Sequence, residues 1–305
     1  MLIRERNEKG GVIWGLVFFT LLAAFYGFRL SFPPEPYYDE VYHVASARNI
    51  LKLQAYVDVH PALGHVVHAL SLLILGDHSW VWRISSLLFS VLVVFLIYGI
   101  VKELARDRLA GFFAAGFSIF ECISLTQARM MMHNSQMLFF MLLSLYCLIL
   151  HTESGRLMRR KAFLLSGLSL GLGFASRWVA LGIAPLIWLL LAKSKKRLQG
   201  GSERTKFWKD VFWGFVLVPV AVYLASQLVI PFLNGFGWSD VWNQSVNIFR
   251  YHTHLTEGHT YGSPWWSWPF MTRPIWYFFE RKEGLVRGIL CIGNPAIFWV
   301  IPLVI

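Results

Sequence analysis

Apolar residues in this chain come in long uninterrupted runs rather than at the spacing of one helix face. Most runs are about 17–20 residues long, the length that an α-helix needs to cross the hydrocarbon core of a bilayer, and several are a residue or two shorter. We therefore predict an all-α, polytopic membrane protein forming one domain over residues 1–305. The predicted membrane helices cover residues 12–29, 83–101, 109–126, 135–150, 162–176, 178–192, 211–230 and 287–305.

Three parts of this pattern need separate interpretation. The first run follows Arg4, Arg6 and Lys9 and lacks a convincing small-residue cleavage site, so we expect an uncleaved signal anchor. Residues 60–76 are apolar but contain three histidines, which favours an interfacial or re-entrant helix. The last run ends without a polar flank, so we expect the chain to be a C-terminally truncated form of a longer protein.

Basic residues between the runs predict the orientation of the chain. With a cytoplasmic N-terminus, segments 1–11, 102–108, 151–161 and 193–210 are internal and hold 17 of the 28 Lys and Arg residues. Positive charge accumulates on the cytoplasmic side of membrane proteins, so this orientation is favoured. Two long loops, 30–82 and 231–286, then lie outside, where we expect any chemistry to take place.

Composition agrees with this pattern: 56% of residues are hydrophobic and only 15% are charged. The net charge of +11 does not indicate a nucleic-acid partner, because the basic residues form short clusters between apolar runs. We interpret these clusters as topology determinants and contacts to anionic membrane lipid. The three cysteines lie in apolar runs and show no metal-ligand spacing.

Adjacent carboxylates, Asp39 and Glu40, follow two tyrosines in the first outer loop. Near lipid a carboxylate loses solvation, which raises its pKa and suits it to act as a general base. The alternative is that both residues stabilise the positive N-terminus of a helix over 39–53.

Three arginines, Arg83, Arg129 and Arg177, lie at outer helix ends. Guanidinium groups bind phosphate bidentately and stay charged, so the three could hold a lipid phosphate or pyrophosphate. The alternative is that each reaches towards the lipid headgroups. The spacing of His60, His65 and His68 does not place three ligands on one tight helix face, so we predict no metal.

The second outer loop alternates aromatic with polar residues. Flat aromatic faces beside polar groups suit a sugar ring or an extended peptide, although aromatic residues also gather at membrane interfaces. The candidate binding residues of this loop are His252, His259, Tyr261, Trp265, Trp268 and Arg273.

Together these motifs resemble the protein O-mannosyltransferase family, which has the GT-C membrane fold and is glycosyltransferase family 39. The resemblance covers essentially the whole chain, and its last stretch is the most specific. It is carried by Asp39-Glu40, Asp58-Val-His60-Pro-Ala-Leu-Gly64, Trp82-Arg83, Ala128-Arg129, Ser176-Arg177-Trp178, Tyr251-His252, and Ser263-Pro-Trp-Trp-Ser-Trp268-Pro269 through Arg273-Pro274-Ile-Trp-Tyr277.

This resemblance implies an inverting transfer of mannose, or another hexose, from a polyprenyl- or dolichyl-phosphate sugar to Ser or Thr hydroxyls of exported polypeptides. It assigns Asp39 as the general base, Glu40 as an orienting group and Arg83 as the phosphate ligand. His60, Arg129, Asn134, Arg177 and the second-loop residues are then substrate-binding candidates. The lipid-linked sugar is a substrate, and neither a cofactor nor a catalytic metal is implied.

Three departures from the family pattern bear on substrate choice: His65 and Asn134 stand where the family usually has Lys and Asp, and Arg177 where Lys is more usual. Three alternatives stay open. The acceptor could be a lipid or polysaccharide, as for aminoarabinose transferases; the chain could be an inactive truncated homologue; or it could be a transporter or non-catalytic membrane partner. Compact loops favour a prokaryotic plasma membrane over the endoplasmic reticulum.

Overall fold

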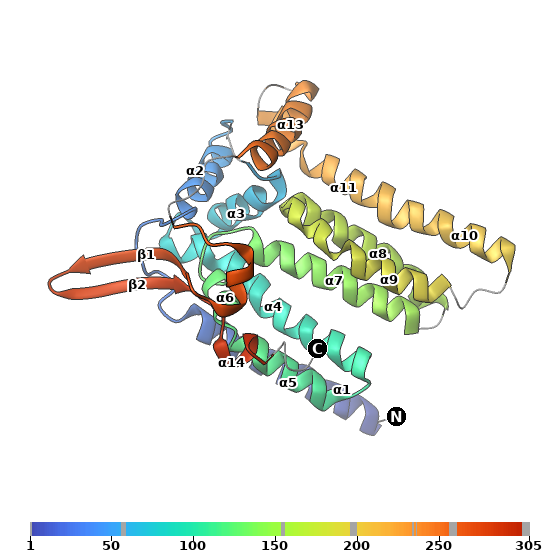
Figure 1. The fold of residues 1–305 in the computed structure, drawn as a ribbon. Helices are drawn as coiled ribbons and strands as arrows, with labels where there is room; N and C mark the ends of the chain where they lie inside the picture. Colours follow the sequence, from blue (N-terminus) through green and yellow to red (C-terminus); the bar gives the residue numbers. More distant parts are fainter. Residues whose placement is uncertain are drawn as a thin grey trace.

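The structure is a computed structural model that describes residues 2–55, 59–153, 156–195, 200–233, 235, 237–255 and 261–300. Long helices lie side by side and form its body (Figure 1). They are α1 (Leu2–Gly27), α4 (Ser79–Ala105), α5 (Arg108–Ile119), α7 (Asn134–Glu153), α8 (Arg156–Ser176), α9 (Ala184–Lys195), α10 (Gly201–Phe212) and α11 (Val218–Ser226). A 3-10 turn, η1 (Trp178–Ile183), precedes α9, and a π-helical turn, η2 (Trp213–Leu217), joins α10 to α11.

Three described helices are long and apolar enough to cross a membrane: Ser79–Ala105, Asn134–Thr152 and the continuous stretch Gly201–Leu233. Neighbouring helices exchange hydrogen bonds between buried serines, as between Ser90 and Ser135 (Oγ–Oγ 2.8 Å). Large apolar side chains face outwards instead, among them Phe112 and Phe117 of α5, which are each more than half exposed. Outward apolar faces with polar contacts inside are typical of a helical membrane bundle, so the prediction of a polytopic helical protein is confirmed.

Shorter elements gather at one end of the bundle (Figure 1). They are α2 (Glu40–Leu51), α3 (Ala62–Leu75), α6 (Cys122–Gln127), α12 (Val229–Leu233), α13 (Trp238–His254), η3 (Trp265–Phe270) and α14 (Pro295–Phe298). The first predicted outer loop supplies α2 and α3, and the second supplies α13. Both loops therefore meet at the same end of the helices, as the charge pattern requires.

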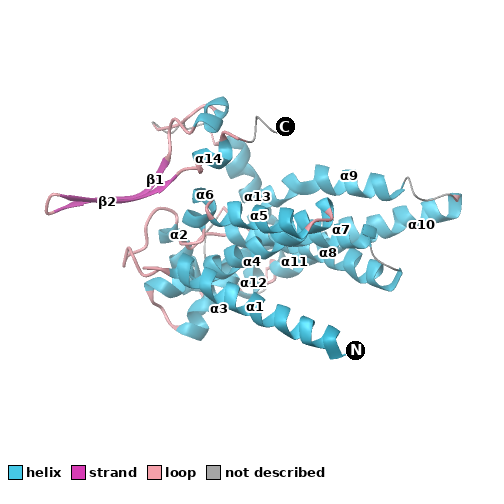
Figure 2. Cartoon of the chain, turned by 90° about the horizontal axis from the view of Figure 1, so that it is seen from below, coloured by secondary structure: helices cyan, strands magenta, loops and turns pink. Residues whose placement is uncertain are grey.

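The prediction of a membrane helix over 287–305 is wrong. Strand β1 (Ile275–Lys282) pairs antiparallel with β2 (Leu285–Cys291), and the hairpin projects from the helical body (Figure 2). Glu283 and Gly284 both have positive φ, which suits the tight turn between two twisted strands. The apolar residues of β2 thus belong to a hairpin. This also moves the end of the second outer loop beyond residue 286.

The predicted helix over 109–126 is also interrupted. Helix α5 ends at Ile119, and α6 begins at Cys122 with Glu121 as its N-cap. The Glu121 carboxylate accepts a hydrogen bond from the Ser124 N–H (2.7 Å), which stabilises the new helix start. The break turns the chain across the end of the bundle and brings Gln127 to the region where the outer loops meet.

Candidate functional site

Glu40 and Arg83 form a fully buried ion pair between α2 and α4. The Arg83 Nε and Nη2 atoms each donate to a Glu40 carboxylate oxygen at 2.9 Å. Arg83 Nη1 donates to the Leu30 carbonyl (2.7 Å), and the Met131 N–H donates to Glu40 (2.7 Å). Both side chains have 0% exposure. Such complete mutual satisfaction is what allows two charges to be buried.

Arg83 as the ligand of the donor phosphate stays a prediction, and this geometry does not favour it. The Arg83 guanidinium is buried, and its Nε, Nη1 and Nη2 atoms already donate to protein oxygens. The expected orienting role of Glu40 fits the structure better, because its carboxylate ties α2 to α4 and to Met131. The Glu40–Arg83 ion pair therefore fixes the position of the backbone at Asp39, the residue before Glu40.

Asp39 differs from its neighbour in being only partly buried. It occupies the N-cap position of α2, yet its side chain makes no capping hydrogen bond. The alternative interpretation, that Asp39 serves as a helix cap, is therefore not supported. Burial raises the pKa of Tyr38, and the Asp39 carboxylate adds to that rise.

A second polar network joins three predicted binding residues from separate parts of the chain. Arg177 follows α8, and its Nη1 donates to the side-chain oxygen of Asn134 at the start of α7. Its Nη2 donates to His60 Nε2 at 3.3 Å. These three residues are partly exposed, so a cationic group with oriented hydrogen-bond partners is available here to an anionic ligand.

Gln127 and Tyr277 extend this network towards the hairpin, and sequence reasoning missed their roles. Asn134 donates to the Gln127 side-chain oxygen (2.8 Å), and Gln127 donates to the Tyr277 hydroxyl (2.7 Å). The Tyr277 ring in turn packs on Tyr38 at a centroid distance of 4.6 Å. Burial raises the pKa of Tyr277, which keeps its phenol protonated. The family motif includes Tyr277, but only the folded hairpin brings its side chain to this network.

A cavity of about 870 Å³ lies beside this network, within the roughly 300–1,000 Å³ typical of small-ligand sites. Tyr261, Trp268 and Arg273, all predicted binding residues, line it together with Tyr38 and Tyr277. The Arg273 guanidinium lies 5.7 Å from the centre of the Tyr261 ring and donates to the Gly262 carbonyl (2.7 Å). The cavity wall therefore combines aromatic faces with a positive charge.

The other predicted residues are distributed around these groups. His252 donates to the Val59 carbonyl (3.2 Å), and its ring stacks near His60 at 6.0 Å. Trp265 is 75% exposed, whereas His259 lies outside the described residues. Arg129 lies near Arg83 and donates to the Arg29 carbonyl (3.3 Å), and burial lowers its pKa. The three arginines thus do not form one phosphate clamp, because Arg177 belongs to a different network.

Buried histidines form a third group that sequence reasoning did not find. His43 and His133 join His65 beneath His60, with ring centroids 4.4 Å apart for His43–His133 and for His65–His133. Gly64 makes this approach possible, because a Cβ at that position would collide with the His133 ring. Burial, followed by the neighbouring histidines, lowers the pKa of His133 well below its usual value and keeps the imidazole neutral.

Comparison with known proteins shows the family of the chain. A family model described as dolichyl-phosphate-mannose-protein mannosyltransferase matches residues 72–230. A second, the C-terminal four-transmembrane region of protein O-mannosyltransferase, matches residues 237–305. The polyprenol-phosphate-mannose–protein mannosyltransferase of Mycobacterium tuberculosis is 23% identical over 96% of this chain and 69% of its own length. These matches confirm the resemblance inferred from the motifs.

Two solved structures share the fold. The Saccharomyces cerevisiae protein O-mannosyltransferase Pmt1-Pmt2 complex bound to the sugar donor superposes with a TM-score of 0.64 and 20% identity over 69% of this chain. ArnT from Cupriavidus metallidurans in the apo state gives 0.56 and 13% identity over 83%. This chain spans 32% of the yeast chain and 46% of the ArnT chain. The GT-C fold expected from the sequence is thereby confirmed.

Proposed function

This chain belongs to the dolichyl-phosphate-mannose–protein mannosyltransferase family, and on that premise we propose that it mannosylates exported proteins. The donor is a polyprenyl-phosphate-linked mannose, and the acceptor is a Ser or Thr hydroxyl of a polypeptide. The similarity to the mycobacterial protein mannosyltransferase over 96% of the chain supports this choice of substrates. The donor brings the activated sugar with it, so the proposal needs no separate cofactor.

The observation that carries the proposal is a series of contacts from Tyr38, the chain neighbour of Asp39, to Arg177. Tyr38, next to Asp39, packs on Tyr277. From Tyr277, hydrogen bonds run through Gln127 and Asn134 to Arg177. A carboxylate and an unburied guanidinium group thus belong to one connected site beside an aromatic cavity. This is the set of groups that hydroxyl attack on a sugar phosphate requires.

In the proposed reaction, Asp39 accepts the proton of the acceptor hydroxyl as its oxygen attacks the anomeric carbon of the sugar. The bond from that carbon to the phosphate oxygen breaks, and the polyprenyl phosphate leaves with the bonding electrons. Attack opposite to the leaving group inverts the anomeric configuration. Arg177, oriented by Asn134 and His60, balances the charge that develops on the phosphate.

We place this reaction on the non-cytoplasmic side of a prokaryotic plasma membrane. The concentration of Lys and Arg in the loops at the opposite end of the helices supports this orientation. The outer loops supply α2, α3 and α13 at the end where Asp39 and Arg177 lie (Figure 1). An exported polypeptide would reach this end from the aqueous phase, while the donor lipid would remain in the bilayer.

A membrane assay with polyprenyl-phosphate mannose and a Ser/Thr-containing peptide tests the proposal. We expect Asp39→Asn to lower the rate of transfer by about 100-fold or more, because general-base catalysis contributes at least that much. Glu35→Gln is the matched control, since Glu35 is an exposed acid of the same loop. It should transfer mannose at the wild-type rate.

Size-exclusion chromatography of each purified variant separates loss of chemistry from loss of folding. Unchanged transfer by well-folded Asp39→Asn would rule out Asp39 as the base. Transfer by the wild-type chain to lipid or polysaccharide, with none to peptide, would overturn the proposed acceptor. A complete lack of transfer by the wild-type chain would favour the inactive homologue.

A further inference from the structure

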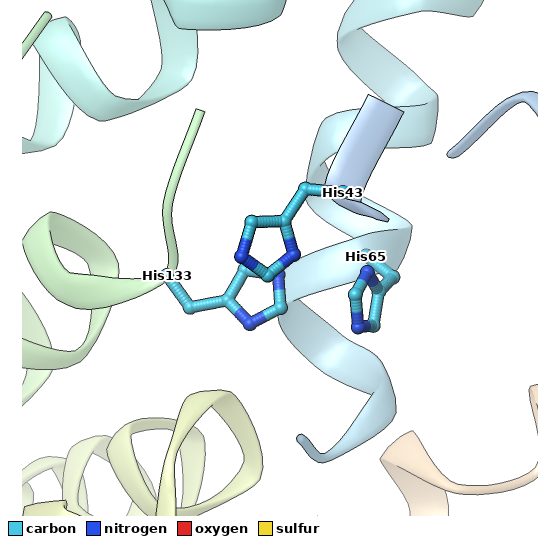
Figure 3. A group of neighbouring side chains, drawn as sticks. All are labelled: His43, His65 and His133. Atoms are coloured by element: carbon cyan, nitrogen blue, oxygen red, sulfur yellow. The ribbon is translucent and has the colours of Figure 1, made fainter. Parts of the chain in front are cut away.

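Three buried histidines converge from separate elements beneath the site. His43 lies on α2, His65 on α3, and His133 just before α7 (Figure 3). Each offers a ring nitrogen, and these nitrogens all lie within 4.8 Å of one another. None of the three side chains is more than 3% exposed. The fold therefore brings together three potential metal ligands that are far apart in the sequence.

His133 supplies a second, independent indication of a ligand. Its side chain is fully buried, yet neither ring nitrogen has a hydrogen-bond partner. A buried polar atom without a partner costs free energy, and such atoms are rare in folded proteins. Figure 3 shows the His133 ring lying close to that of His43, with His65 beside them. A bound ion at the centre of the three would give His133 the missing partner.

The donor set selects the class of ion. We propose that His43, His65 and His133 bind a divalent transition-metal ion of the zinc class. Neutral imidazoles suit zinc, copper, nickel and iron, whereas calcium and magnesium require oxygen ligands. Metal ions coordinate imidazole in its neutral form.

The site needs only small adjustments to bind zinc. Zn–N bonds of about 2.0–2.1 Å place the nitrogens of a tetrahedral site about 3.3 Å apart, compared with up to 4.8 Å here. Rotation of the imidazole rings about their side-chain bonds can close such a difference. Three protein ligands leave one position of a tetrahedral ion for a further ligand.

The ion would join three elements that carry the proposed active site. It would tie α2, which follows Asp39, to α3 and to the segment that leads into Asn134. The His60 ring lies 5.6 Å from that of His133, and His60 also accepts from Arg177. We assign the ion a structural role, because metal binding to a folded site adds directly to stability.

Metal analysis of the full chain, purified in detergent with an affinity tag that lacks histidine, tests the inference. We expect about one equivalent of zinc-class metal per chain after dialysis against metal-free buffer. Chelator treatment should lower the melting temperature, and added Zn²⁺ should restore it. Co²⁺ in place of the native ion should give the intense visible absorption of a tetrahedral site. No saturable binding of Zn²⁺ and no such spectrum would overturn the inference.

His133→Gln tests one of the three ligands, with His254→Gln as the matched control at an exposed histidine of α13. We expect His133→Gln to weaken Zn²⁺ affinity by more than the roughly 10–100-fold that follows loss of a ligand's hydrogen-bond partner. His254→Gln should bind as the wild type does. Equal affinity of all three proteins would exclude the site. The Co²⁺ spectrum is measured on the wild-type chain. It therefore still tests the site if His133→Gln does not fold.

Discussion

Two charged centres at the same end of the bundle differ in how completely the protein satisfies them. At the Glu40–Arg83 pair, both side chains are fully buried and bond to each other and to backbone groups. In the Arg177 network, the guanidinium bonds to the neutral side chains of Asn134 and His60 and stays partly exposed. The first centre holds the fold together, whereas the second keeps positive charge available for a ligand.

The adjacent residues Asp39 and Glu40 show the same difference within two positions of the chain. Glu40 points into the bundle, where its charge is neutralised by Arg83. Asp39 precedes the first turn of α2 and follows Tyr38, which lines the cavity. The buried carboxylate of Glu40 therefore positions the partly exposed carboxylate of Asp39. Three substitutions test this division between architecture and chemistry.

Arg83→Met should have the largest effect, because it leaves the Glu40 carboxylate buried without its counter-charge. We expect a loss of about 3–5 kcal/mol in the free energy of unfolding, seen as a large drop in melting temperature in detergent. Arg29→Met, at an exposed arginine, should change stability little. The double variant Glu40→Gln/Arg83→Met should recover part of the loss. If Arg83→Met melted at the same temperature as the wild type, the Glu40–Arg83 pair would not be needed for the stability of the fold.

Arg177→Gln should lower mannosyl transfer while the protein remains folded. We expect a decrease of about 100-fold in kcat/KM, or roughly 2.7 kcal/mol, because charge on the leaving phosphate is no longer balanced. Arg204→Gln is the matched control, since Arg204 is exposed on α10 and far along the chain from the site. Transfer by Arg177→Gln at the wild-type rate would remove Arg177 from the proposed mechanism.

Tyr277→Phe should give the smallest effect. It removes the hydroxyl that accepts from Gln127 but keeps the ring that packs on Tyr38. We expect a loss of about 1 kcal/mol in stability, with little change in the folding of the helical body. Tyr42→Phe, at an exposed tyrosine of α2, should melt as the wild type does. A Tyr277→Phe protein indistinguishable from that control would mean that the network ends at Gln127.

Sequence reasoning succeeded where the signal lay within one segment. Apolar runs predicted α1, α4, α5, α7, α8, α9 and α11, because membrane helices are continuous in sequence. Most of α10 lies in segment 193–210, which was predicted to be an internal loop. The same approach failed at 287–305, since an apolar window does not distinguish a strand of a hairpin from a helix. Pairing with β1 depends on the turn at Glu283 and Gly284.

Contacts between distant segments could not be predicted in the same way. Glu40 and Arg83 are 43 residues apart, and nothing local indicates that one neutralises the other. The resemblance to a family brought His60, Asn134 and Arg177 into consideration, but not their mutual hydrogen bonds. The histidine group was missed because spacing was examined only within residues 60–68, whereas two of its members lie elsewhere.

The close approach of His133 to Gly64 has an evolutionary consequence. No methyl group fits between α3 and that imidazole, so position 64 cannot gain a side chain while His133 keeps its place. Among related proteins, we expect any residue larger than glycine at position 64 to occur together with a smaller side chain at position 133. A lineage that retained the imidazole would have to retain the glycine, although the glycine itself bears no functional group.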